Sequence, residues 1–320
     1  MRTILTACFL TALGWEGRAE HHAGGAAFLS PVQTPAPVQP SAPVYVPHRV
    51  FDTSRETFSD FEMMQADLAR ADAVLVGEQH DSPNTHLLER AMLEGLARRR
   101  VAVTLSLEMF ERDVQASLDS YVAGTSAESD FLKGSRAWPR YASDYRPLVE
   151  FARSQHWPVV AANVPRRIAS EIAKNGRAAM DSLSADDRRL AATDLQCPRD
   201  AYFDRFAAQM GEHSSSTPAG APGERAERYY WAQCLKDETM AEAIAVAVAK
   251  QEGRPGVVVH LTGAFHIDFG GGTVERVRRR LAARRVVTVS ILQLEDIDID
   301  GLVPAGDDLK RADYLLYTIK

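Results

Sequence analysis

Two histidines of the chain occur in the same short pattern, Gly-x-x-His, after runs of small and apolar residues. Residues 73–77, Ala-Val-Leu-Val-Gly, lead to His80, and residues 256–262 lead to His266. Apolar runs of this length that stop at glycine and polar residues are typical of strands buried on both faces. Each histidine is therefore expected just beyond the carboxyl end of a strand, where open parallel sheets gather ligands and reacting groups.

Other polar residues follow apolar runs in the same way. Glu78 precedes the first histidine, Glu108 follows the run 101–107, and Asn163 follows the run 158–162. If these strands are parallel neighbours, their carboxyl ends meet at one edge of the sheet. The set then suits a divalent metal ion held by oxygen and nitrogen ligands, or acid–base catalysis without a metal.

A structural explanation of each histidine competes with a functional one. A single histidine at a strand end is more often a hydrogen-bonded structural residue than a ligand, and Gly-x-x-His alone is a weak motif. Two copies at equivalent strand ends, together with Glu108 and Asn163, favour a functional site. We expect His86 in the first turn of a helix, with a supporting role as the minority alternative, and His260 packed inside a strand.

The order of the apolar patterns predicts an α/β fold with a mainly parallel β-sheet flanked by helices. The first helix is expected from a cap at Ser59 to about Ala71. Strands are expected in the apolar runs already named and in two runs that follow later in the chain. The further helices are expected over residues 84–100, 111–123, 144–155 and 273–284, and the later strands over 286–292 and 313–319.

Residues 166–250 contain helical patterns and no strand pattern, which predicts an inserted helical cap subdomain. In its last helix Gln233 and Asp237 are four residues apart and share a face that we expect at a pocket, with Asn163 and Arg166 nearby. The opposite face carries residues expected to pack on the core: Met240, Ile244 and Ala247.

The amino-terminal segment predicts export from the cytoplasm. Residues 1–19 carry one early positive charge and a short apolar run, as a signal peptide or lipoprotein leader does. Cys8 lies in a lipobox-like tetrapeptide, so it is either the lipidated first mature residue or part of an ordinary leader. Residues 20–47 are a proline-rich linker, and residues 48–320 the folded domain. The predicted location is the periplasm or a lipid anchor on the bacterial envelope.

Composition and charge narrow the function classes. The formal net charge of −6 gives no general attraction to nucleic acid. An arginine cluster is expected on one solvated helix face, with a phosphate-binding patch as the alternative; its members are Arg276, Arg278, Arg279, Arg280, Arg284 and Arg285. Cys197 and Cys234 are either a disulfide pair, as an oxidising compartment allows, or two unrelated buried thiols.

Five ordered blocks resemble the ChaN-like haem-binding uptake family of the Tiki/TraB superfamily, over about residues 50–295. The blocks are Gly77-Glu78-x-His80-Asp81, Leu107-Glu108-Met109-Phe110 with Gln115 following, Asn163-Val164-Pro165-Arg166, Ala232-Gln233-x-x-x-Asp237-x-x-Met240-Ala241, and Gly263-Ala264-x-His266. The resemblance implies an exported haem-binding protein of iron uptake. It also implies a homodimer and a partnership with outer-membrane haem or iron transport machinery.

The wider superfamily implies an alternative, a metal-dependent hydrolase of peptide bonds. In it His80, His266, Glu78 and Glu108 would hold the ion, with the two glutamates as catalytic groups. Haem instead needs an axial donor, an apolar slot and basic groups for its propionates. The candidate haem residues are Tyr141, Tyr145, Tyr229, Tyr230 and His213, with Tyr202 and Trp231 also in the insert. A third class, a scaffold with a relict site, would leave the polar strand ends unexplained.

Overall fold

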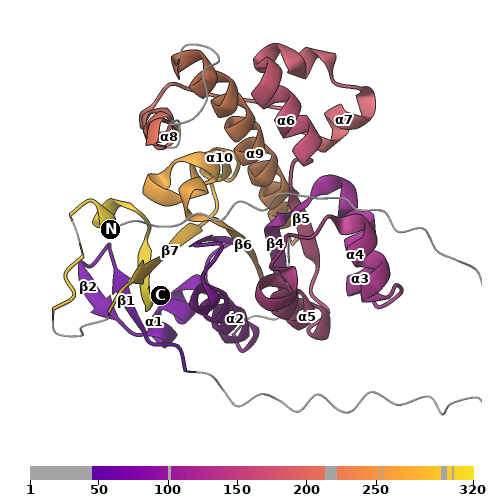
Figure 1. Ribbon diagram of the computed structural model, residues 1–320. Helices are drawn as coiled ribbons and strands as arrows, with labels where there is room; N and C mark the ends of the chain where they lie inside the picture. Colours follow the sequence, from indigo (N-terminus) through magenta and orange to yellow (C-terminus); the bar gives the residue numbers. More distant parts are fainter. Residues whose placement is uncertain are drawn as a thin grey trace, which may run out of the picture. The chain divides into compact units, whose positions relative to one another are not determined.

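The computed structural model describes residues 45–99, 102–212, 222–251, 253, 255–296, 301–304 and 306–320. The predicted leader, most of the linker and His213 lie outside these residues. Residues Tyr45–Lys320 form one compact unit, which Figure 1 shows as a sheet with helices around it.

The described strands form one eight-stranded sheet in the order β2-β1-β8-β7-β3-β6-β4-β5. All neighbours from β8 to β5 pair in parallel, whereas β1 pairs antiparallel with both β2 and β8. The predicted mainly parallel sheet is thereby confirmed. The strands are β1 His48–Asp52, β2 Thr57–Ser59, β3 Ala73–Glu78, β4 Ala102–Glu111, β5 Val159–Asn163, β6 Gly256–Gly263, β7 Val286–Leu294 and β8 Tyr314–Ile319.

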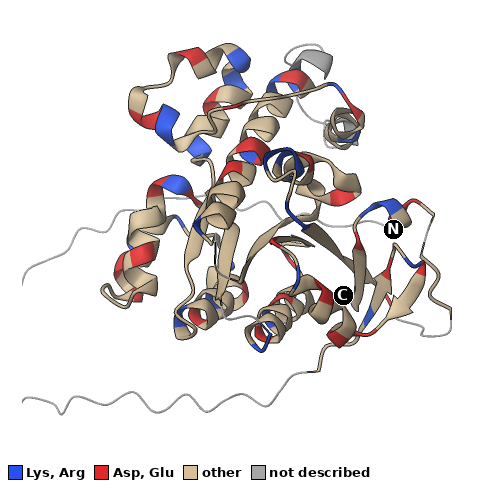
Figure 2. Cartoon of the chain, turned by 180° about the vertical axis from the view of Figure 1, so that it is seen from behind, with Lys and Arg blue, Asp and Glu red and all other residues tan. Residues whose placement is uncertain are grey.

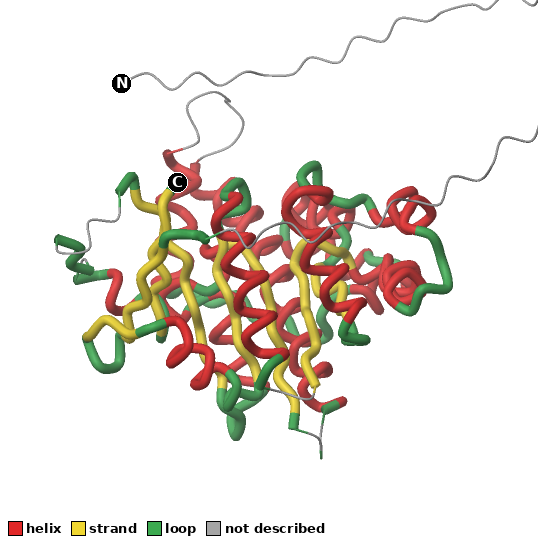
Figure 3. Tube along the Cα trace, turned by 90° about the horizontal axis from the view of Figure 1, so that it is seen from below, coloured by secondary structure: helices red, strands yellow, loops and turns green. Residues whose placement is uncertain are grey.

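Helices cover both faces of the sheet, which explains why its central strands β3 and β6 are buried along their whole length. Val74 and Val76 of β3 pack in a cluster with α1 to α5, whereas Ala73 and Leu75 face α9 and α10. Figure 3 shows helices running along the strands. These helices are α1 Phe61–Leu68, α2 Pro83–Ala97, α3 Gln115–Val122, α4 Glu128–Ser135, α5 Arg146–Ser154, α9 Pro222–Lys250 and α10 Gly272–Arg280. Each large aliphatic side chain buried in this way stabilises the fold by about 1.5–3 kcal/mol.

The start of α1 differs from the prediction. Ser59 belongs to β2 and pairs with Val50, and Asp60 is the residue that caps the helix. The Asp60 carboxylate accepts a hydrogen bond from the Met63 amide at 2.6 Å. Since an aspartate accepts such a bond as well as a serine, the sequence pattern did not distinguish the two positions.

The described part of residues 166–250 contains helices and no strand. It consists of α6 Arg166–Asn175, α7 Ala185–Leu190, α8 Ala201–Glu212 and α9, with a 3₁₀ segment at Arg177–Ser182. A disulfide joins Cys197, before α8, to Cys234 in α9. Met240, Ile244 and Ala247 of α9 are buried. The long helix α9 therefore connects the insert to the sheet, as Figure 1 shows.

The arginines of α10 correct a second prediction. Arg276 is 1% exposed, and its guanidinium donates to the carbonyl oxygens of Gly272 and Gln196. Arg279 and Arg280 form ion pairs with Glu238 of α9, a fully buried residue, at 2.7 and 2.5 Å. Because an unpaired buried carboxylate is costly, these guanidinium groups pair with α9. Arg278, Arg284 and Arg285 are exposed, as expected. Figure 2 shows basic segments of α10 beside acidic segments of α9.

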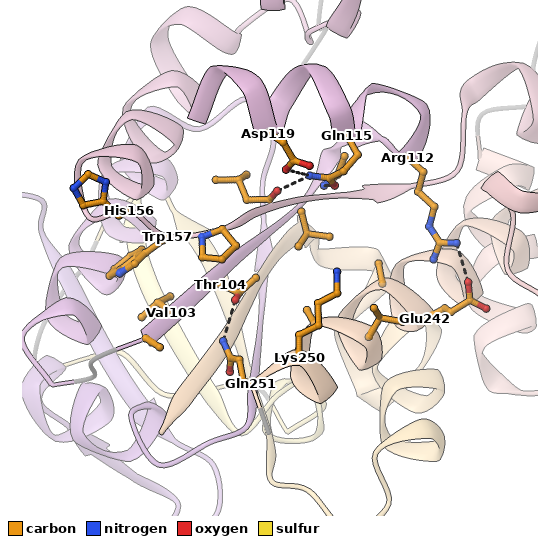
Figure 4. Close-up of a pocket in the computed structure, with 18 of the residues that line it drawn as sticks. Val103, Thr104, Arg112, Gln115, Asp119, His156, Trp157, Glu242, Lys250 and Gln251 are labelled. Atoms are coloured by element: carbon orange, nitrogen blue, oxygen red, sulfur yellow. Dashed lines mark hydrogen bonds and ion pairs between the residues drawn. The ribbon is translucent and has the colours of Figure 1, made fainter. Parts of the chain in front are cut away.

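Strand β5 lies at the edge of the sheet, and the Gln115 side chain occupies its outer edge. The side-chain amide donates to the Val159 carbonyl oxygen at 2.8 Å and accepts from the Ala161 amide at 2.7 Å. Figure 4 shows Gln115 in this position, on the wall of a cavity of about 750 Å³ between β5, α3 and α9. One side chain thus replaces a neighbouring strand at an edge that would otherwise be open to pairing.

Replacing Gln115 with alanine exposes these two backbone groups. We expect Gln115→Ala to lower the free energy of unfolding by about 1–3 kcal/mol, as two lost hydrogen bonds imply, and to promote self-association. Urea denaturation and sedimentation velocity measure the two effects. Gln155→Ala, at an exposed glutamine, is the control, and equal behaviour of the two variants would contradict this role.

Candidate functional site

A cavity of about 380 Å³ lies at the carboxyl edge of the sheet. Four strands line it: His80, Asn163 and His266 lie at or just beyond the ends of β3, β5 and β6, and Glu108 lies inside β4, near its carboxyl end. Its remaining lining residues are Glu111, Trp138, Val164, Arg166 and Lys236. Parallel pairing of the four strands thus brings distant parts of the sequence together, while Glu78 lies buried behind His80.

His80 is oriented by a buried carboxylate. Its Nδ1 lies 2.5 Å from Glu78 Oε1, and the Tyr145 hydroxyl donates to the same oxygen at 2.7 Å. A carboxylate only accepts hydrogen bonds, so Nδ1 carries a proton and Nε2 is left for the cavity. Burial disfavours the charged imidazole, but the hydrogen bond and charge of Glu78 raise the pKa of His80 above its ordinary value.

His266 has an equivalent partner in Asp237 of α9. His266 Nδ1 lies 2.7 Å from Asp237 Oδ1, and Nε2 lies 3.5 Å from Glu108 Oε1. Burial alone would lower its pKa, but the charges of Glu108 and Asp237 raise the pKa of His266 to about 10. At neutral pH the ring is therefore an imidazolium between two carboxylates.

Asp237 is itself held by several donors. The Thr273 hydroxyl donates to Oδ1 at 2.8 Å and the Tyr202 hydroxyl donates to Oδ2 at 2.9 Å. Gln233, one helical turn earlier, donates to the Tyr202 hydroxyl at 2.9 Å. The expected pair Gln233 and Asp237 thus lies behind His266 and fixes its ring, and neither residue lines the cavity wall.

Glu108 joins two strands. Its Oε2 accepts from the Thr262 hydroxyl at 2.5 Å and from the Gly263 amide at 2.8 Å, both at the end of β6. Burial raises the pKa of Glu108, but the charge and hydrogen bond of His266 outweigh burial and hold the pKa well below its usual range. His80, Glu108 and His266 thus line one cavity, and a metal ion held by them together with Glu78 stays a prediction.

The glycines of the two motifs permit close approach. A Cβ on Gly263 would lie 2.7 Å from His80 Nε2, and a Cβ on Gly77 would lie 2.7 Å from the Ile267 side chain. The His80 ring therefore rests directly on the backbone of the second motif. Each glycine is needed for contact between the two strand ends, as expected for a backbone that approaches a ligand group closely.

The rim of the cavity is basic and aromatic. Trp138 packs edge-on against His80, with ring centroids 4.9 Å apart. Arg166 and Lys236 line the cavity, and neither forms an ion pair with any residue that the structure describes. Asn163 is 8% exposed, and its Oδ1 has no hydrogen-bond partner among the described residues. These groups are suited to an anionic ligand with an aromatic or apolar body.

A second group of ionisable side chains lies behind His80, and sequence reasoning largely missed it. His86 Nδ1 lies 3.0 Å from Glu89 Oε2, and His86 Nε2 lies 3.5 Å from Asp144 Oδ2. Burial and the charge of Glu78 raise the pKa of Glu89 well above its usual range. The spacing of His86 and Glu89 on one face of α2 could have indicated this pair, whereas Asp144 comes from a distant segment.

The tyrosines proposed from the sequence occupy different environments. Tyr141 and Tyr145 are buried in a π-helical turn, Tyr141–Tyr145, before α5. Tyr230 is buried, and its hydroxyl donates to the Pro198 carbonyl oxygen at 3.0 Å. Tyr229 is 39% exposed on α9. Among these four, Tyr229 is the tyrosine available to a ligand at the surface.

Fold and site define an α/β protein with two carboxylate-bound histidines at the carboxyl edge of its sheet. The family described as haem-binding uptake, Tiki superfamily, ChaN matches residues 64–277. The chain belongs to this family. No curated protein matches the chain in sequence.

Solved structures resemble the chain in fold. ChaN of Campylobacter jejuni, described with cofacial haem binding, has a TM-score of 0.61 and 17% sequence identity to this chain. The match covers 84% of this chain and 96% of the ChaN chain. An erythromycin esterase mutant in its open conformation has a TM-score of 0.47 and 10% identity and covers 85% of this chain and 97% of its own. Family membership supports haem as the ligand and does not favour the hydrolase alternative.

The contact of His80 with Gly263 yields a test of the site geometry. We expect Gly263→Ala to lower the free energy of unfolding by about 1–3 kcal/mol, because the added methyl group forces the His80 ring to move. Urea denaturation measures the loss. Gly134→Ala is the control, since a Cβ at Gly134 meets nothing within 4 Å; two equally stable variants would contradict the contact.

Proposed function

We propose that the protein binds haem over the mouth of the His80 and His266 cavity, along α9. The observation that carries the proposal is the pair of unpaired basic side chains, Arg166 and Lys236, beside Trp138 at the rim. Haem requires basic partners for its propionates, an apolar surface for its ring and an iron donor. The first two requirements are met here, and family membership supports the ligand.

We assign the iron donor to Tyr229. It precedes Lys236 by seven residues on α9, which places the two on one face of the helix about 10 Å apart. Long side chains on a helix point toward its amino terminus, so the Lys236 side chain extends toward Tyr229. Haem, when bound, supplies ferric iron, for which a tyrosine phenolate is an established donor. Arg166 and Lys236 would then hold the propionates, and His80 would be a further hydrogen-bond partner.

His80 is the alternative iron donor. Its Nδ1 is held by Glu78, so Nε2 is the free nitrogen, and its side chain is 41% exposed. A carboxylate on the opposite ring nitrogen makes an imidazole a better ligand. The two assignments predict different spectra, since phenolate and imidazole ligation of ferric haem differ in the visible region.

We also propose that the protein is exported, functions in haem uptake as a periplasmic or lipid-anchored homodimer, and passes haem to or from outer-membrane transport machinery. The leader and linker sequence support export, and the family description supports uptake. Among the described residues, no helix has the length and apolar character needed to cross a bilayer. The mass of the mature amino terminus distinguishes cleavage near residue 19 from lipidation of Cys8.

Titration with haemin, followed by the Soret band, tests the proposed function. We expect one haem per chain, and at least about a tenfold loss of affinity, equivalent to 1.4 kcal/mol, in Tyr229→Phe. Arg166→Ala and Lys236→Ala should weaken binding and leave the visible spectrum unchanged. Tyr45→Phe, at a tyrosine that is 78% exposed outside α9, is the control.

Each outcome of this titration has a defined meaning. No stoichiometric binding by the wild-type protein would contradict haem binding itself. A wild-type spectrum in Tyr229→Phe, together with an altered spectrum in His80→Ala, would identify His80 as the iron donor. That result would overturn the assignment of Tyr229 and leave haem binding itself intact.

A further inference from the structure

A buried cluster lies behind His80 and outside the cavity. Glu78 is 1% exposed, His86 5% and Glu89 0%. His86 Nδ1 lies 3.0 Å from Glu89 Oε2 and 3.8 Å from Glu78 Oε2. One donor atom from each residue can be chosen so that all three lie within 4.8 Å of one another. Neither of the proposed haem contacts, Tyr229 or Lys236, belongs to this group.

The hydrogen bond of His86 fixes its tautomer. His86 Nε2 lies 3.3 Å from the His80 carbonyl oxygen, which can only accept, so Nε2 carries a proton. In a neutral ring, Nδ1 then presents a lone pair toward the oxygens of Glu78 and Glu89. A lone pair facing carboxylate oxygens is repulsive. The cluster therefore needs a cation or a shared proton at its centre.

Two carboxylate oxygens at the same place lack partners. Glu78 Oε2 and Glu89 Oε1 are buried and have no hydrogen-bond donor among the described residues. The other oxygen of Glu78 is engaged by His80 and Tyr145. Unsatisfied buried polar atoms are rare in folded proteins, and each one requires an explanation such as an ion. A nitrogen lone pair and free carboxylate oxygens together form a ligand set.

We propose that Glu78, His86 and Glu89 bind a divalent transition-metal ion such as Zn²⁺ or Mn²⁺. One imidazole nitrogen and two carboxylates are a common donor set for these ions. Metal–ligand distances of about 2.0–2.2 Å correspond to ligand–ligand separations of roughly 3–3.6 Å. His86 Nδ1 lies 3.0 and 3.8 Å from the nearest oxygens of Glu89 and Glu78. The His86 Nε2 hydrogen bond to a carbonyl oxygen is the outer contact that metal-bound histidines usually make.

The ion would also act on the neighbouring site. Glu78 binds His80 through Oε1 and would bind the ion through Oε2, so the metal would fix the carboxylate that orients the His80 ring. The competing occupant is a proton shared by Glu78 and Glu89, for which no metal is required. The proposal does not depend on haem binding, because none of its three ligands lines the cavity.

Metal analysis of the full-length protein tests the site. The wild-type protein, produced in zinc-supplemented medium and desalted, should retain one Zn²⁺ per chain by plasma mass spectrometry. Glu89→Gln keeps the shape of a protonated glutamate but removes the charge, so we expect it to lose at least about tenfold in zinc affinity. Glu242→Gln, at a carboxylate paired with Arg112, is the matched control and should retain the ion.

Absence of zinc and manganese from the wild-type protein would overturn the proposal and leave the shared proton as the occupant. Equal zinc retention in Glu89→Gln and Glu242→Gln would overturn it as well. Should Glu89→Gln fail to fold, anomalous diffraction from wild-type crystals at the zinc edge decides the matter. A peak between Glu78, His86 and Glu89 supports the site, and a peak in the His80 and His266 cavity, or no peak, contradicts it.

Discussion

The hydrogen bonds that Glu108 accepts from Thr262 and Gly263 hold the ends of β4 and β6 in register, and the candidate site depends on them. They fix the backbone of Gly263, on which the His80 ring rests. They also fix the turn that carries His266 toward the same carboxylate. A buried carboxylate that receives a backbone amide, a hydroxyl and an imidazolium is fully compensated, so this charge can remain in the protein interior.

The two histidines have the same kind of partner, a carboxylate on Nδ1, and differ in charge. Glu78 and Asp237 each bind the Nδ1 of one ring, so both Nε2 atoms are directed away from their carboxylate partners. His266 is charged and fixed among buried groups, whereas His80 reaches the cavity beside Trp138. Helix α9 connects the parts, because it carries Tyr229 and, about two turns later, Lys236 and Asp237. A ligand bound at the rim would therefore be coupled through the same helix to the hydrogen bond between Asp237 and His266.

The sequence predicted the central strands β3 and β6 because they are buried on both faces and lead into the Gly-x-x-His pattern. The runs before His80 and His266 are apolar without alternation, and parallel pairing then brings their ends together. It did not predict β1 and β2, which are short and only partly buried. It also missed the burial of Arg276, whose charge is compensated by α9, a segment distant in sequence. Tyr141 and Tyr230 were equal candidates to Tyr229, because exposure depends on packing that spacing does not specify.

The tautomers and charges of the two histidines test this account most directly, and long-range ¹H–¹⁵N NMR measures them. With assignments from His80→Gln and His266→Gln, we predict a proton on Nδ1 of both rings at neutral pH. His266 should remain an imidazolium until the pH approaches about 10. A proton on Nε2 and none on Nδ1 of His80, or a neutral His266 at pH 7, would contradict the carboxylate–histidine pairing on which the site is built.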